Sequence, residues 1–104
     1  MKLYTIDYIP GAEIEALGTV CGTTVQATHL GHDLLAGLKN LVGGEIEDYT
    51  EMLTRARDTA LARMTAQARE LGADAVVNLR FGSASVMQSA AEVIAYGTAV
   101  RIKG

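Results

Sequence analysis

The spacing of hydrophobic and polar residues divides the chain into strand-like and helix-like segments. Apolar and aromatic side chains dominate residues 2–9, which we therefore expect to form a short strand closed by the Pro-Gly turn that follows. Residues 14–28 again favour a strand, because β-branched side chains are frequent there. Gly18 and Gly22 interrupt this second segment and predict either a bulge or a close backbone approach.

Two segments show the periodicity of amphipathic helices. The first, residues 32–42, carries leucines at helical spacing and ends at a double glycine. The second runs from about residue 48 to 71, with acidic residues at its start and Gly72 after its end, as the helix dipole and a C-terminal cap favour. Its expected buried stripe comprises Tyr49, Met52, Leu53, Ala56, Ala60, Met64 and Leu71.

Two further strands are expected after the long helix. Residues 73–81 favour a strand, and the Gly-Ser-Ala-Ser run at 82–85 predicts a turn, so that a hairpin follows. The last segment alternates strictly between large and small side chains. We expect the large row to face the helices: Ile94, Tyr96, Thr98, Val100 and Ile102. The small row is then a second buried face or a surface for another subunit: Val93, Ala95, Gly97 and Ala99.

Strands before and after the helices predict an α+β fold, with residues 1–104 forming one domain. We expect a mostly antiparallel sheet packed on one side by a short and a long helix. The chain is 49% hydrophobic but only 5% aromatic, so its core is built from small and medium-sized side chains. An apolar chain of this length favours self-association, which hides part of its surface.

Charge and cysteine content narrow the classes of function. The net charge of -3 argues against nonspecific nucleic-acid binding, which needs a basic surface. No apolar run approaches the roughly 18 residues of a membrane span, and the first residues do not read as a signal peptide. The single cysteine excludes an intrachain disulfide framework and fits a reducing compartment. We therefore expect a cytoplasmic protein with no nucleic-acid or membrane partner.

Cys21, His29 and His32 are the candidate metal ligands. A thiolate with two imidazoles suits zinc or a softer transition metal, and Asp33 offers an additional oxygen. Their spacing matches no compact metal signature, so a structural role, with Cys21 as a small packing residue, stays open as the alternative. A histidine-activated Cys21 would also be a nucleophile, but no hydrolase signature accompanies it.

Arg57 is a second candidate, because a helical wheel places it beside the apolar stripe, where a guanidinium needs a partner. That partner is a carboxylate or carbonyl of this chain or of another subunit, or else a bound anion. An acidic group near the start of the long helix suits either a hard cation, acid–base chemistry or a solvated helix terminus: Glu45, Glu47, Asp48 and Glu51. No motif supplies a reaction, so we expect no enzymatic activity.

Several short motifs occur in an order similar to that of one known family. They are Val42-Gly43-Gly44, Tyr49, Ala56-Arg57 with Ala60, Leu71-Gly72-Ala73-Asp74-Ala75-Val76-Val77 and Gly97-Thr98-Ala99-Val100. With these motifs, residues 14–102 resemble the YbjQ-like family, whose domain is described as heavy-metal-binding. The resemblance implies an α+β subunit of the YbjQ-like or dodecin-like kind, assembled into a ring of five. It implies no catalytic residue.

Two positions depart from that family's pattern. Glu45 stands where an arginine often follows the double glycine, and family members typically lack His29 and His32. Our leading hypothesis is a ring-forming, non-enzymatic homo-oligomer with strand edges and the Gly97 row at its interface. A transition-metal protein using Cys21, His29 and His32 is the first alternative. Small-ligand binding or catalysis at a subunit junction, with Arg57 involved, is the second.

Overall fold

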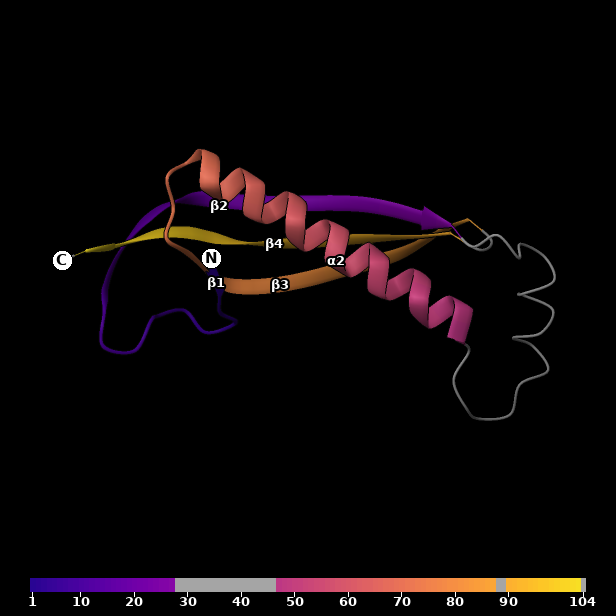
Figure 1. The fold of residues 1–104 in the computed structure, drawn as a ribbon, viewed down its shortest axis with the longest axis horizontal. Coiled ribbons are helices and arrows are strands. Elements are labelled where there is room, and N and C mark those ends of the chain that lie inside the picture. Colours follow the sequence, from indigo (N-terminus) through magenta and orange to yellow (C-terminus); the bar gives the residue numbers. More distant parts are fainter. Residues whose placement is uncertain (28–46, 88–89, 104) are drawn as a thin grey trace.

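The computed structural model describes residues 1–27, 47–87 and 90–103. In this part of the chain, four strands form one layer and a long helix forms a second (Figure 1). The elements are β1 (Lys2–Leu3), β2 (Glu13–Ala27), α2 (Glu47–Glu70), β3 (Ala75–Met87) and β4 (Ala90–Lys103). The short helix expected at 32–42 lies outside the described residues. The α+β class is confirmed, with the long helix within one residue of its expected bounds at each end.

The sheet has the strand order β1-β3-β4-β2. Its central strand, β4, pairs antiparallel with both β2 and β3. β1 runs parallel to β3, so the sheet is mixed, which corrects the simpler antiparallel expectation. The reason is that the segment after β1 crosses from the β3 edge to the opposite edge before β2 begins (Figure 1).

The strand expected over residues 2–9 is shorter than predicted, because the regular ladder with β3 stops after Leu3. The segment that follows stays tied to β3: the Tyr4 amide donates to the Val76 carbonyl at 2.8 Å, and the Asn78 amide donates to the Ile6 carbonyl at 2.9 Å. Farther on, Ile9 is buried against a small cluster on the sheet: Ala75, Val77 and Val100. The Pro-Gly turn is confirmed, with the Ala12 amide bonded to the Ile9 carbonyl.

Helix α2 packs on the sheet with a row of residues spaced four apart. This row, fully buried, consists of Met52, Ala56, Ala60, Met64 and Ala68. Leu53 and Leu71, expected in the stripe, are 36% and 44% exposed, because Leu53 lies beside this row on the helix surface and Leu71 follows the last residue of α2. Gly72 has a φ of 77° and ends the helix as predicted, its amide bonded to the Arg69 carbonyl and the Ala73 amide to the Ala68 carbonyl.

The two faces of β4 are the reverse of the expectation. Val93, Ala95 and Ala99 share the main core with α2, so the small row faces the helix. The large row lies on the other side, where Tyr96 and Ile102 are each 43% exposed. The cause is the close approach of α2: a Cβ built on Gly22 of β2 would lie 2.1 Å from the Ala60 carbonyl oxygen, so only small groups fit beneath the helix.

Gly97 is also buried, so it does not lie on an outer surface. A Cβ at this position would meet the Val76 side chain at 2.7 Å and the Val77 carbonyl at 2.9 Å. The placement of a subunit interface on the row of Val93, Ala95, Gly97 and Ala99 is therefore wrong, because this chain's own helix and neighbouring strand occupy that side.

The turn predicted at 82–85 is also wrong. β3 continues through these residues in unbroken antiparallel pairing with β4, from Phe81 opposite Ala95 to Ser85 opposite Ala91. Small polar residues are compatible with a strand when a neighbouring strand satisfies their backbone groups. The hairpin between β3 and β4 exists, but it closes after Met87.

Candidate binding site on the open face of the sheet

Two bulges lie on either side of the same residue of the central strand. In β2 the register with β4 shifts between Ala16 and Gly18, which confirms the bulge predicted there. In β3 it shifts between Val77 and Arg80. Both shifts flank Thr98, which pairs with Thr19 on one side and Val77 on the other. Bulges bend and twist strands and occur often beside functional sites, so this level of the sheet is a natural place for a hollow.

The bulge in β3 decides which way the following side chains point. Asn78 has a φ of 57°, a left-handed conformation that Asn tolerates better than most residues. Because Asn78 is the extra residue of the bulge, Arg80 pairs with Tyr96 and lies on the side of the sheet away from α2. Uninterrupted alternation from Val77 would have placed Arg80 on the helix side.

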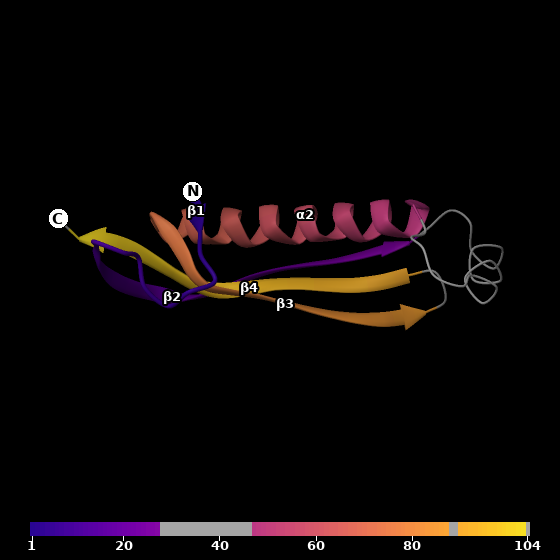
Figure 2. The same cartoon turned by 90° about the horizontal axis from the view of Figure 1, so that it is seen from below.

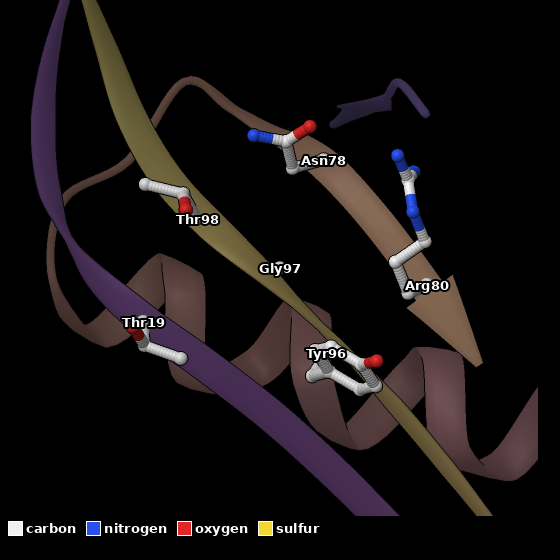
Figure 3. Close-up of a pocket in the computed structure, with 6 residues that line it drawn as sticks. All are labelled: Thr19, Asn78, Arg80, Tyr96, Gly97 and Thr98. Atoms are coloured by element: carbon white, nitrogen blue, oxygen red, sulfur yellow. The ribbon is translucent and has the colours of Figure 1, made fainter. Parts of the chain in front are cut away.

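The sheet surface that faces away from α2 is covered at one end by the cluster around Ile9. We define the rest of this surface as the open face: Thr19, Cys21, Thr23, Arg80, Ile94, Tyr96 and Thr98. A hollow of about 290 Å³ lies on it. Figure 3 shows its lining: Asn78 and Arg80 from β3, Tyr96, Gly97 and Thr98 from β4, and Thr19 from β2. The described lining residues therefore carry three hydroxyl groups, one amide and one guanidinium, and none of these residues is acidic.

Backbone carbonyls fix the position of the Arg80 guanidinium. Its Nη1 donates to the Thr5 carbonyl at 2.7 Å and to the Leu79 carbonyl at 2.9 Å. Within the described residues, no carboxylate lies close enough to form an ion pair with it. Since a guanidinium has five N–H donors, Nη2 and Nε keep donors that these two carbonyls do not use. The site thus holds a positioned positive charge.

Of the three candidate metal ligands, Cys21 is the one that lies in the described part of the chain. Cys21 is exposed on the open face as a free thiol, and its amide donates to the Gln67 side-chain oxygen at 2.8 Å. His29, His32 and Asp33 lie outside the described residues. In residues 1–27, 47–87 and 90–103, no three His, Cys, Asp or Glu side chains are grouped to hold a metal ion. The metal site of Cys21, His29 and His32 therefore stays a prediction.

Arg57 is exposed in the described part of the chain, not buried beside the apolar stripe, and a partner in another subunit stays a prediction. The Arg57 side chain is 54% exposed and forms an ion pair with the neighbouring Asp58, at 3.2 Å between Nη2 and Oδ1. Such an exposed pair contributes little to stability, because water screens it. Of the acidic group, Glu51 is exposed on α2 and Glu45 lies outside the described residues.

Of the residues that line the hollow, the sequence singled out Gly97, as an interface residue, and placed Tyr96 and Thr98 in the large row of the last strand; it did not indicate Thr19, Asn78 or Arg80. Val77, Leu79 and Phe81 alternate regularly, which hides the register shift between them. One signal was available: Asn78 is a poor strand residue that accepts positive φ, and it lies within the shift. Whether its backbone uses that freedom depends on the pairing with β4 and on the hydrogen bond to Ile6.

In the part of the chain that the structure describes, no helix is long and apolar enough to cross a membrane. Among solved structures, a protein of unknown function from Pediococcus pentosaceus, assigned to the DUF74 family, superposes with a TM-score of 0.71, covering 99% of this chain and 98% of that one. Its sequence identity is 19%, so the similarity shows the shared fold alone.

Sequence comparisons identify the family directly. A family model described as "Putative heavy-metal-binding" matches residues 1–103. A UPF0145 protein of Pseudothermotoga lettingae is 61% identical over 104 residues, covering 99% of this chain and 98% of the relative. A UPF0145 protein of Archaeoglobus fulgidus is 59% identical over 100 residues, covering 95% and 93%. These matches confirm the family resemblance that the motifs indicated. The chain belongs to the YbjQ-like family of UPF0145 proteins.

Proposed function

We propose that the chain is a non-catalytic subunit that assembles with further copies of itself into a closed ring in the cytoplasm. The observation that carries this proposal is the far half of β3, residues 81–87. No described residue pairs with its outer edge, since β1 ends at Leu3 and pairs only with the start of β3. Soluble proteins normally cover or disrupt such an edge, because it offers unpaired backbone groups to other chains.

The side chain of Phe81, at the start of this segment, is also uncovered in the described part of the chain. Phe81 pairs with Ala95, which places it on the helix side of the sheet, yet it is 46% exposed. The reason is the position of the helix: α2 lies along β2, and β3 is the farthest from it of the three long strands (Figure 2). An exposed aromatic ring next to an open edge is complementary to a second polypeptide that supplies both backbone partners and apolar contacts.

The opposite edge of the sheet is different, which favours a ring over a symmetric pair. Two side chains of α2 occupy the outer edge of β2: Gln67 accepts from the Cys21 amide, and Arg63 donates to the Thr23 carbonyl at 2.6 Å. The two edges of the sheet therefore present unlike surfaces. Contacts between unlike surfaces are head-to-tail, and they close into rings when the rotation between subunits allows it. The family resemblance suggests five subunits.

The test is native mass spectrometry of wild-type protein, prepared without a metal-affinity tag, and of Phe81→Lys. We expect the wild type at a multiple of the 11.0 kDa chain, with five copies predominant. Phe81→Lys should shift the protein to lower mass, because a buried lysine at a strand-edge contact must be desolvated.

Leu71→Lys is the matched control, since Leu71 is 44% exposed and lies between the end of α2 and the start of β3, outside the segment 81–87. It should keep the wild-type mass. A wild type that is monomeric at micromolar concentration would contradict the proposal, and an unchanged mass for Phe81→Lys would remove β3 from the interface.

The family description supports a second candidate function, in which Cys21 binds a transition metal together with His29 and His32. The exposure of the Cys21 thiol on the open face leaves it accessible to a ligand shared within one chain or between subunits. Elemental analysis of the same tag-free protein tests this function. Near-stoichiometric metal that is lost in Cys21→Ser would support it, and metal-free protein, or stoichiometry unchanged in that variant, would exclude Cys21 as a ligand.

A further inference from the structure

We infer that the hollow on the open face is a binding site for a small organic oxyanion, a molecule that carries one carboxylate or phosphate group on a flat apolar body. The site lies within a single subunit and is lined by Thr19, Asn78, Arg80, Tyr96 and Thr98, with the backbone of Gly97. The inference does not depend on ring assembly, because each lining residue belongs to the same chain.

The charge of the site selects an anion. Arg80 is held by the carbonyls of Thr5 and Leu79, not by a carboxylate of the described residues, so its positive charge is not neutralised there. A guanidinium whose orientation is already fixed loses little side-chain entropy when it binds a ligand. Its remaining N–H donors match the oxygens of a carboxylate or phosphate.

The other lining groups define the rest of the ligand. The hydroxyls of Thr19 and Thr98 and the Asn78 amide supply neutral hydrogen-bonding groups around the charge. The Tyr96 ring, 43% exposed, offers a flat surface on which a planar ligand can stack. The volume of about 290 Å³ is at the lower end for ligand pockets, which limits the ligand to a small molecule. The chain's net charge of -3 disfavours a polyanion such as nucleic acid.

The backbone shows that this arrangement requires a specific conformation. The left-handed Asn78 places Arg80 on the open face, and the Gly18 bulge shifts β2 at the same level of the sheet. Residues in sparsely populated backbone conformations cost free energy and tend to occur at functional sites. Asn78 is the one residue other than glycine with positive φ in the described chain, and it sets the position of Arg80, the one charged residue among the described lining residues.

Isothermal titration of the intact protein at fixed ionic strength tests the inference with three probes: phenyl phosphate, benzoate and phenol. We expect at least one of the two anions to bind about tenfold or more tightly than phenol, because phenol offers the same ring without the charge. Binding of phenyl phosphate alone would assign the ligand to phosphate esters. Binding of benzoate alone would assign it to carboxylates.

Two variants locate the binding. Arg80→Gln should weaken anion binding by about tenfold or more, whereas Arg69→Gln, which removes an exposed arginine of α2, should leave it unchanged. If Arg80→Gln fails to fold because the tie to Thr5 is lost, Thr98→Val provides an isosteric removal of one hydroxyl and should weaken binding several-fold. The inference is overturned if neither anion binds at millimolar concentration, or if Arg80→Gln and Thr98→Val both bind like the wild type.

Discussion

At the scale of single residues, glycine determines how closely α2 approaches the sheet. Gly22 lies under the helix, where an added Cβ would be 2.1 Å from the Ala60 oxygen and 2.4 Å from the Met64 nitrogen. Both atoms belong to the helix backbone, so neither can move aside as a flexible side chain would. The helix must therefore shift as a unit if any larger residue replaces Gly22.

We predict that Gly22→Ala lowers the free energy of unfolding by at least about 2 kcal/mol, because overpacking forces backbone displacement. Urea denaturation at constant protein concentration measures this change. Gly82→Ala is the control: Gly82 is also in a strand, but an added Cβ there has no neighbour within 4 Å. Its change should stay within about 0.5 kcal/mol. Equal effects of the two substitutions would show that the close helix contact is not the cause.

At the scale of elements, α2 both covers the sheet and protects one of its edges. Arg63 and Gln67 lie one helical turn apart, so their side chains reach the same edge of β2. There they satisfy the Thr23 carbonyl and the Cys21 amide, which would otherwise face solvent as unpaired strand groups. Among the described strands, this leaves the far half of β3 as the edge without a partner and connects the helix packing to the proposed direction of assembly.

Removing one of these side chains should make β2 available to other chains. We predict that Arg63→Met costs about 1 kcal/mol of stability and increases the fraction of large aggregates seen by light scattering on prolonged incubation. Arg69→Met, in the last turn of the same helix, removes an equal charge away from the β2 edge and should cause neither effect. An aggregation rate equal to the wild type in Arg63→Met would argue against the protective role.

At the scale of the whole molecule, the chain is elongated. Its radius of gyration is 17.0 Å, and its principal extents are 56 × 25 × 16 Å. A compact domain of about 100 residues has a radius of gyration of about 13 Å. The long β3–β4 hairpin and α2 extend together in one direction (Figures 1 and 2), so more of the surface is exposed than in a rounded domain. Covering that surface in an oligomer would contribute to stability.

This shape leads to a prediction about thermal unfolding. If association stabilises the folded subunit, the Tm should rise with protein concentration, by several degrees over a hundredfold range, because mass action favours the assembled state. Differential scanning calorimetry at several concentrations measures the change. Phe81→Lys should have a lower Tm with a weaker concentration dependence. A Tm that is independent of concentration in the wild type would indicate that folding and assembly are not coupled.

The sequence by itself determined the features that depend on local chemistry. The long helix and its end at Gly72, the strand that begins near residue 14, the bulge at Gly18 and the Pro-Gly turn all follow from periodicity, capping and backbone freedom. The close approach at Gly22 was also predictable, since a glycine within a strand indicates a bulge or a near neighbour. The order of the short motifs along the chain likewise indicated the family.

Only the tertiary structure decided which face of each strand is buried and where the open surfaces lie. Alternation along β4 separates two rows but does not say which row meets the helix. The small row does, because α2 approaches through its own alanines and leaves no room for large side chains. Likewise, Arg80 reaches the open face because pairing with β4 and the bond to Ile6 accommodate an extra residue at Asn78. These outcomes depend on contacts between segments far apart in the chain, and no local pattern encodes them.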